Sequence, residues 1–320
     1  MCANERCTVN VEVYIIDCPC HRRSVSVHVT APRQAFVEGK KMAVAVITDS
    51  QSCIPAPMAE ELGITVLPFT LQMDGILYRD GVDITPQEFY ELLPRLSRPA
   101  TTSAVSPGVF LEAIAELSRK GDEVLVVTIS SSMSATYNNA RLAAETFRDA
   151  RVEVLDSRTA AIAQGLAVLE VARAALRGEC FEECLRLGRE LCASAELFAY
   201  ISTFEYLRRS GRVNPIAALA ADALSIKPVF RFKDGEAVLA AKKRSPDKAR
   251  RFIAARVREY YERRGPSRVA VFHASAPEEA KELADMIRDG VEIREEVIVS
   301  QFTPVMGCHT GPGVVGAAFV

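Results

Sequence analysis

The sequence predicts an α/β protein of two domains, with a largely parallel sheet in the first domain and a mixed sheet in the second. In the first half, short β-branched and apolar runs such as Ala43–Ile47 and Glu123–Ile129 alternate with helical patterns. Strands that are apolar on both faces are typical of parallel sheets covered by helices. In the second half, the turn Lys233–Glu236 separates two strand-like runs and predicts an antiparallel hairpin. A chain of 320 residues is long enough for two cores.

We expect the first domain to span residues 42–158 and the second domain to span residues 159–320. Residues 1–41 look foreign to the rest, and they hold four of the nine cysteines: Cys2, Cys7, Cys18 and Cys20. The Cys-Pro-Cys-His stretch among them lacks the ligand spacing of a zinc ribbon or finger, so we expect no metal. Because Met42 directly precedes a strand pattern, our hypothesis is that Met42 is the natural start and that residues 1–41 lie outside the fold.

Composition argues against several classes of function. The formal net charge of -2 gives no general attraction to nucleic acid or to an acidic membrane. No apolar run reaches the roughly 18 residues that a membrane-spanning helix needs, and no signal-peptide pattern is present. The nine cysteines are an odd number without the spacing of a disulfide scaffold. A reduced, cytoplasmic protein is the simpler interpretation.

The elements of the first domain follow in order along the chain. Strand patterns cover Ala43–Ile47, Ile64–Leu71, Ile76–Tyr78, Glu123–Ile129 and Val152–Asp156. Helical patterns cover Pro55–Leu62, a segment beginning at Pro86, Gly108–Lys120 and Ala140–Phe147. The segment Pro99–Pro107 is expected to be a loop rich in hydroxyl side chains.

The second domain begins with helices and then mixes hairpins with helical crossovers. Helical patterns cover Ala160–Leu176, Lys248–Arg264 and Pro277–Ile287. Strand patterns cover Phe198–Thr203, Ile226–Phe232, Ala237–Lys242, Arg268–His273, Ile293–Ser300 and Val314–Val320. The segment Phe204–Arg212 is expected to be a basic helix end or turn.

Hydroxyl and acidic side chains follow several of the predicted strands. Thr48-Asp49-Ser50 follows the first strand, and Thr101–Ser106 lies in the hydroxyl-rich loop. Ser130–Thr136, between a strand and a helix, carries five hydroxyl side chains in seven residues. The carboxyl ends of parallel strands and the starts of helices both favour bound anions. A serine N-cap with solvated neighbours is the simpler alternative for the last run.

Seven motifs occur in one order along the chain: Thr48-Asp49-Ser50, Thr102-Ser103 with Ser106, Ser130-Ser131 with Ser134 to Tyr137, Asp156-Ser157, Leu207 to Arg212, Ile226 to Pro228, and Gly307 to Gly313 with His309. Together they resemble the DegV family of bacterial fatty-acid-binding proteins. Any one motif is weak, whereas seven in family order make the resemblance specific. It covers Val44 to Phe319 and leaves out residues 1–41.

The resemblance implies a two-domain fold in which a buried apolar tunnel holds a long-chain fatty acid. It assigns the binding of the carboxylate to four hydroxyl side chains: Thr102, Ser103, Ser130 and Ser131. Which of the two serines Ser130 and Ser131 makes the direct contact stays open. The protein is then a carrier without chemistry or cofactor of its own. It presents the carboxylate to the catalytic subunit of a separate fatty acid kinase, which makes an acyl phosphate, and any membrane contact is transient.

The chain departs from the family pattern beside the hydroxyl loops. Ala104-Val105 stands where the family usually has Gln-Pro, and Ala135 stands where it usually has glycine. The extra methyl group of Ala135 is expected to narrow the loop beside the head group. An apolar tunnel would favour acyl binding by about 0.8 kcal/mol for each buried CH₂, while the carboxylate must find hydrogen-bond donors.

Three further side chains are candidates for a place near the head group or a partner. His309 can act as a base or as a hydrogen-bond donor, or it can simply hold the Gly-Pro-Gly turn. Arg212 can pair with a carboxylate or phosphate, or it can be a solvated arginine at a helix end. Asp49 can orient the hydroxyl groups of the site, or it can serve as a turn or cap residue.

An enzyme is the alternative function. Ser131 or Ser130, together with His309 and an aspartate at position 49 or 156, would supply the parts of a serine-dependent lipid or ester hydrolase. The chain contains no Gly-x-Ser-x-Gly elbow, and hydroxyl clusters bind carboxylates without a base. Phosphotransfer through His309 is a third possibility.

Overall fold

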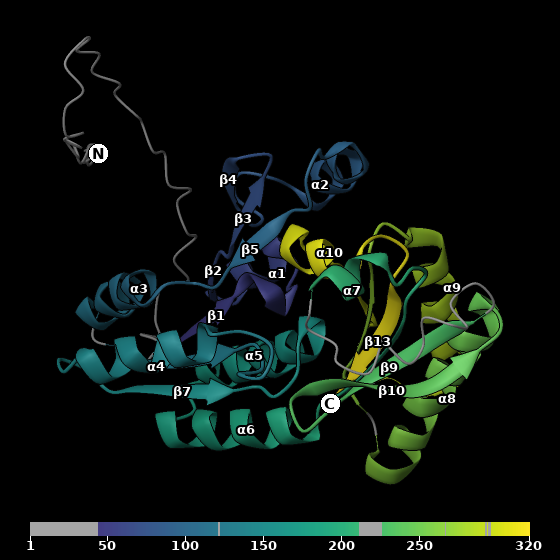
Figure 1. Cartoon of the computed structure of the whole chain (residues 1–320). Helices are drawn as coiled ribbons and strands as arrows, with labels where there is room; N and C mark the ends of the chain where they lie inside the picture. The colour runs from purple at the N-terminus through teal and green to yellow at the C-terminus, as the bar shows by residue number, and fades with distance from the viewer. Residues whose placement is uncertain (1–43, 121, 211–225, 266, 292, 294–295) are drawn as a thin grey trace, which may run out of the picture. The chain divides into compact units, whose positions relative to one another are not determined.

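Four parallel strands form the first sheet (Figure 1): in spatial order they are β2 (Thr65–Leu67), β1 (Val44–Asp49), β6 (Glu123–Thr128) and β7 (Val152–Asp156). This computed structural model describes residues 44–120, 122–210, 226–265, 267–291, 293 and 296–320. All six residues of β1 are buried, because this strand lies between two others and is covered on both faces. The sheet predicted for the first half is confirmed.

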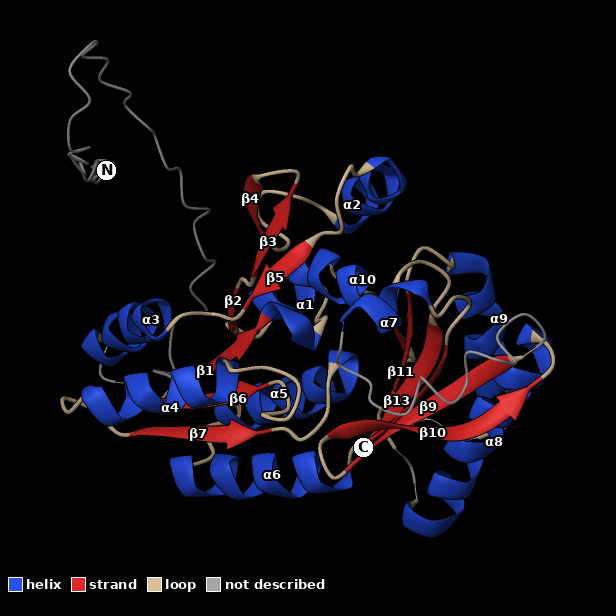
Figure 2. Ribbon diagram, viewed as in Figure 1, coloured by secondary structure: helices blue, strands red, loops and turns tan. Residues whose placement is uncertain are grey.

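Helices cover both faces of this sheet. On one face, β1 and β6 share a core with α3 (Pro107–Arg119) and α4 (Thr136–Thr146). On the other face, their alternate residues pack against the helices α1 (Ala56–Glu61), α5 (Ala161–Leu176) and α6 (Phe181–Ser194). Figure 2 shows α4 and α6 on opposite sides of β7. The doubly covered sheet explains why its strands are apolar throughout rather than alternating.

The second sheet has six strands and is mixed. Its spatial order is β10 (Glu236–Lys243), β9 (Lys227–Lys233), β8 (Glu196–Tyr200), β13 (Val315–Phe319), β11 (Val269–His273) and β12 (Ile298–Gln301). Only the pair of β11 and β12 is parallel. The helices α8 (Pro246–Arg264) and α9 (Pro277–Arg288) cover one face. The predicted hairpin and the mixed sheet are confirmed.

A third, small sheet corrects two predictions. It contains β4 (Ile76–Arg79), β3 (Thr70–Met73) and β5 (Thr101–Ser103). The single strand predicted for Ile64–Leu71 is wrong: β2 joins the parallel sheet and β3 joins this one. Pro68 lies at the break, where a residue without an N–H group cannot continue a ladder. The hydroxyl-rich loop is likewise not all loop, because β5 within it pairs with β3.

Four short helical segments complete the part of the chain that the structure describes outside the main layers. They are η1 (Ser50–Ser52), α2 (Pro86–Leu92) with η2 (Leu93–Arg95), α7 (Glu205–Ser210) and α10 (Pro304–Thr310). The last of these was not predicted, because its seven residues include a glycine and end at another. Helix α10 contacts α2, α7, β3 and β5, so it joins the small sheet to the second half of the chain.

Helix α5 packs against strands of both large sheets, namely β1 and β6 of the first and β11 and β13 of the second. The described residues all belong to one compact unit, Lys41–Val320. The α/β class with a parallel sheet and a mixed sheet is confirmed, while the domain boundary near residue 158 stays a prediction. Within the described residues, the helices are too short or too polar to cross a bilayer.

Candidate functional site

An apolar cavity of about 350 Å³ is bounded by the six-stranded sheet, the loop after β6 and helix α10. Its volume falls in the range of roughly 300–1,000 Å³ that is usual for small-molecule sites. Most of the lining is aliphatic or aromatic: Phe69, Ala104, Ile129, Met133, Ala135, Ala160, Ala161, Leu197, Ala199, Ile201, Leu207, Phe230, Phe232, Ala237, Phe272, Phe302, Met306 and Val314. Five lining residues are polar: Gln51, Thr102, Ser134, His309 and Thr310. A lining of this kind suits a ligand with a long apolar part and one polar group.

The second sheet forms one wall of the cavity through side chains that alternate along its strands. One row across the strands consists of Phe272, Gly316, Ala199 and Phe230. A Cβ atom added to Gly316 would lie 2.4 Å from the Phe272 ring and 2.5 Å from a backbone oxygen. The two small residues in the middle of this row, Gly316 and Ala199, separate the two phenylalanine side chains at its ends.

Thr102 and His309 meet at the cavity lining although 207 residues separate them in the chain. Thr102 Oγ1 and His309 Nε2 are 2.9 Å apart, and which atom donates depends on the imidazole tautomer. Strand β5 carries the threonine and the last turn of α10 carries the histidine. The Cys308 thiol donates to the carbonyl oxygen of Ala100 at 3.1 Å and joins the two elements. A hydroxyl and an imidazole N–H are both suitable donors to a carboxylate.

The side chains of Ser130 and Ser131 form hydrogen bonds away from the cavity lining. Ser130 is fully buried and its hydroxyl donates to the carbonyl oxygen of Gly235 at 2.7 Å. Ser131 is exposed and its hydroxyl donates to Asp156 Oδ2 at 2.5 Å. Their backbone N–H groups donate to the Thr159 carbonyl and to Asp156 Oδ1. Neither serine lines the cavity, so a carboxylate would have to replace these bonds to reach them.

One other predicted residue, Ser103, faces away from the Thr102–His309 pair. Ser103 is exposed, since neighbouring residues of strand β5 point to opposite faces and Thr102 takes the inner one. Arg212 lies outside the residues that the structure describes. The direct role assigned to these residues in binding stays a prediction.

Asp49 lies behind the cavity rather than on it. Its Oδ2 accepts hydrogen bonds from the Ile129 N–H at 2.8 Å and from Gln164 at 3.2 Å, and its Oδ1 accepts from the Gln51 N–H at 3.1 Å. Ile129 and Gln51 both line the cavity. Burial raises the pKa of Asp49 to about 7, against the lowering effect of these hydrogen bonds. Asp49 thus positions two lining residues from beneath.

A second buried carboxyl group, Asp80, holds the start of helix α10. Its Oδ2 accepts a hydrogen bond from the Ser50 hydroxyl at 2.6 Å, and its Oδ1 accepts one from the Val305 N–H at 3.2 Å. Burial raises the pKa of Asp80 to about 6, and the same hydrogen bonds lower it. Through Val305 this carboxyl group fixes the helix that carries His309.

Sequence reasoning missed three polar residues of the lining: Gln51, Ser134 and Thr310. Gln51 directly follows the Thr48-Asp49-Ser50 motif, and Ser134 belongs to the hydroxyl-rich run, so position alone could have suggested both. Ser134 Oγ lies 2.9 Å from Thr136 Oγ1 and accepts a hydrogen bond from the Thr136 N–H, while the N-cap residue of α4 is Ala135. Thr310 donates to the Met306 carbonyl within its own helix.

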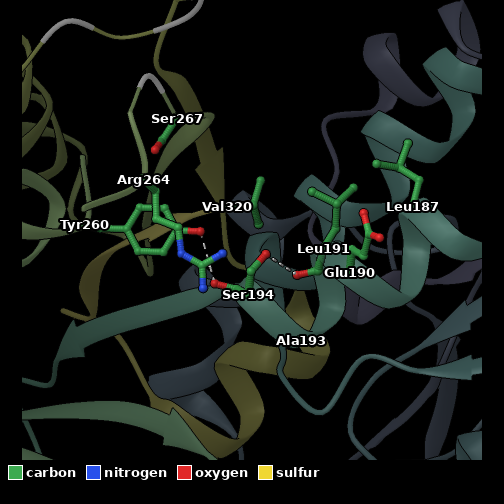
Figure 3. Close-up of a pocket in the computed structure, with 9 residues that line it drawn as sticks. All are labelled: Leu187, Glu190, Leu191, Ala193, Ser194, Tyr260, Arg264, Ser267 and Val320. Atoms are coloured by element: carbon green, nitrogen blue, oxygen red, sulfur yellow. Dashed lines mark hydrogen bonds between the residues drawn. The ribbon is translucent and has the colours of Figure 1, made fainter. Parts of the chain in front are cut away.

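A second hollow of about 500 Å³ lies between the ends of α6 and α8, and Figure 3 shows nine residues that line it. The Tyr260 hydroxyl donates to the Ser194 carbonyl, and the Ser194 hydroxyl donates to the Leu191 carbonyl. Glu190 pairs with Arg186. These groups already have partners in the protein, and the predicted site residues that the structure describes do not line this hollow, so the apolar cavity is the better candidate.

Comparison with known proteins identifies the family of this chain. The family model described as "Uncharacterised protein, DegV family" matches residues 43–320. A DegV domain-containing protein of Clostridium perfringens is 31% identical over 282 residues, which cover 87% of this chain and 99% of that protein.

Solved structures of the same family are similar to this chain over most of its length. A structure described as fatty acid binding of a DegV family protein from Thermus thermophilus has a TM-score of 0.82 at 30% identity and covers 87% of this chain and 99% of that one. DegV from Bacillus subtilis, described as a fatty acid binding protein, has a TM-score of 0.79 at 27% identity, with coverage of 87% and 99%. The resemblance carried by the sequence motifs is confirmed, and the chain belongs to the DegV family.

Proposed function

We propose that this chain binds a long-chain fatty acid, with the acyl chain in the apolar cavity and the carboxylate at Thr102 and His309. The observation that carries the proposal is the pairing of these two residues on a cavity that is otherwise mostly aliphatic and aromatic. The Thermus and Bacillus relatives, which are described as fatty acid binding, support extending that ligand class to this chain.

The energetics favour such a ligand. Each buried CH₂ of the acyl chain contributes about 0.8 kcal/mol, so the tail provides most of the affinity. The carboxylate would lose its water shell and needs donors. When the His309 Nε2–H donates to Thr102 Oγ1, the threonine hydroxyl can donate its own proton to the carboxylate. Ser134, on the same lining, is a further donor within the hydroxyl-rich run.

We further propose that the bound carboxylate is presented to the catalytic subunit of a separate fatty acid kinase. Hydroxyl and imidazole groups can hold a carboxylate without altering it, which suits a carrier acting in the cytoplasm. The kinase would then supply ATP chemistry and make an acyl phosphate for phospholipid synthesis. Incubating the loaded protein with such a kinase and ATP should yield the acyl phosphate, trapped with hydroxylamine. No product would argue against this step while leaving lipid binding intact.

The hydrolase alternative finds no support in the contacts. It would require a Ser131 hydroxyl that donates to His309, whereas Ser131 donates to Asp156 and His309 bonds to Thr102. A nucleophile that lies outside the cavity could not reach a ligand within it.

Lipid extraction from the purified protein tests the proposal. We expect about one fatty acid per folded chain by mass spectrometry under denaturing conditions. Thr102→Val keeps the shape of the side chain but removes the hydroxyl, and it should weaken fatty-acid binding roughly tenfold to a hundredfold, as expected for a hydrogen bond to a charged group. Thr101→Val, on the exposed face of the same strand, is the matched control. Absence of lipid, or equal affinity for the two variants, would contradict this assignment.

A further inference from the structure

The turn of the β9–β10 hairpin touches the serine run that follows β6. The Ser130 hydroxyl donates to the Gly235 carbonyl at 2.7 Å, although 105 residues separate them. Gly235 has a φ of 88°, and a Cβ atom there would lie 2.9 Å from Ser130 Oγ. Only glycine fits this turn without strain or a shift of the serine. The hairpin tip is therefore in close contact with the serine run.

The same hairpin forms a wall of the cavity. Phe230, Phe232 and Ala237 all line it, and Phe232 pairs with Ala237 next to the turn. Met133 and Ser134, on the serine run, line the cavity as well. The contact at the turn thus joins two parts of the lining that come from different halves of the chain.

Among the walls that the described residues build, the tip of this hairpin lies beyond the pairing of β9 with β8, which ends at Arg231. Strand β10 lies at the edge of its sheet, and its residues are all exposed or half-buried. By contrast, β8 lies between two partners and is buried along most of its length. Beyond Ser130, the described residues give the turn one ion pair, Arg158 with Asp234 at 3.7 Å, and both side chains are largely exposed. Such a pair adds little, so the serine bond is the main fixed contact at the tip.

We propose that the β9–β10 hairpin is the movable wall through which ligand enters and leaves the cavity, and that Ser130 is a positioning residue that holds this wall closed. The proposal rests on the proposed function for the identity of the ligand. It gives Ser130 a role different from carboxylate binding, since its hydroxyl proton is already donated to Gly235. Opening requires the loss of that bond and of an exposed ion pair, while the central strands stay paired.

The test measures how fast the bound fatty acid exchanges and how much fatty acid each chain holds at equilibrium. Protein carrying its fatty acid is mixed with deuterated palmitic acid, and exchange is followed by native mass spectrometry. Ser130→Ala should exchange about three to ten times faster, the effect of one lost hydrogen bond, with unchanged lipid per chain. The matched control is Ser202→Ala, which also loses a serine bond to a glycine carbonyl, that of Gly313 at 2.8 Å, away from the hairpin tip. Equal rates for the two variants would overturn the proposal.

A cross-link provides the opposite perturbation. A Cβ atom built on Gly235 lies 3.8 Å from Ser132 Cβ, which is about the mean separation in a disulfide. The double variant Ser132→Cys/Gly235→Cys, once oxidised, should exchange ligand at least about tenfold more slowly than the same protein after reduction. Equal exchange in the oxidised and reduced forms would refute the movable wall. Cysteine at position 235 is expected to be strained, because the backbone there has a positive φ. The Ser130→Ala variant keeps Gly235 and therefore has no such strain.

Hydrogen exchange separates this proposal from the proposed function. If the proteins carry no fatty acid, the proposed function fails, and the hairpin is then judged by its backbone amides. Faster deuterium uptake by residues 233–241 in Ser130→Ala than in Ser202→Ala supports the role of Ser130 in holding the hairpin. Uptake equal in the two variants contradicts it.

Discussion

Asp49 and Asp80 are buried carboxyl groups that act on the cavity through other residues. Their partners are neutral donors: backbone N–H groups, a serine hydroxyl and a glutamine amide. Burial therefore dominates, and it raises the pKa of Asp49 to about 7 and the pKa of Asp80 to about 6. Asp49 places both of its oxygens against residues that line the cavity, and Asp80 places one against the helix that carries His309.

The raised pKa of Asp80 predicts a pH dependence of stability. Its carboxyl group binds a proton more readily in the folded chain than in the unfolded chain, where its pKa is 3.8. This contribution to the free energy of unfolding is complete below pH 3.8 and is lost as the pH rises to about 6. Asp80→Asn keeps the shape without the charge. Between pH 4 and pH 7 its stability should therefore fall less than that of the wild type, by on the order of 2 kcal/mol.

Urea denaturation at a series of pH values measures this difference. Asp49 is present in both proteins, and the Asp80 charge is the smallest of the causes that shift its pKa, so most of its contribution cancels in the comparison. Parallel stability curves for Asp80→Asn and the wild type would show that Asp80 does not titrate in this range.

Among the elements, helix α10 depends on close packing for its position. It carries His309, and at its middle Gly307 lies against the rings of Phe89 and Tyr90 on α2. A Cβ atom at Gly307 would be 2.6 Å from the Tyr90 hydroxyl and 2.7 Å from Phe89 Cε1. Phe89 is fully buried and cannot easily move aside. The absence of a side chain at this position sets the distance between the two helices.

Gly307→Ala should therefore destabilise the fold by about 1–3 kcal/mol, as overpacking usually does, despite the better helix propensity of alanine. It should also weaken fatty-acid binding, because α10 would move His309 away from Thr102. Gly108→Ala in α3 is the matched control, since the nearest atom to its Cβ is 3.9 Å away. Urea midpoints and fatty-acid affinity measure both effects. Similar values for the two variants would mean that α10 tolerates the added methyl group.

For the whole molecule, the core of the described chain begins with β1. Val44 and Val46 pack into the core on one face of the parallel sheet, while Ala45 and Ile47 pack into the core on the other. The family match begins at residue 43. This match supports our proposal that residues 1–41 are not needed for the fold.

A chain that begins at Met42 should have the same urea midpoint and the same lipid content as the full chain. The expectation follows from the family match, which begins at residue 43. A shorter chain that begins after Ser50 is the control. It lacks the strand that pairs with both β2 and β6, and it should not fold. Loss of cooperative unfolding in the Met42 chain would contradict the proposal.

Much of the fold could be predicted because its signals are local. Buried parallel strands are apolar on both faces, and the turn at Asp234-Gly235 has the residues that a tight hairpin needs. The break at Pro68, the short strand β5 and the seven-residue helix α10 were missed or misassigned. Elements of three to seven residues have too few positions to show a period, and their formation depends on partners far away in the chain.

The sequence by itself determined the family, the α/β class and the residue types available for binding a carboxylate, because order and spacing along the chain are enough for these. Only the tertiary structure decided which hydroxyl groups reach the cavity. Thr102 meets His309 across 207 residues, whereas Ser130 and Ser131 donate to Gly235 and Asp156. A hydroxyl group donates one hydrogen bond, and its acceptor is whichever oxygen the folded chain brings within about 3 Å.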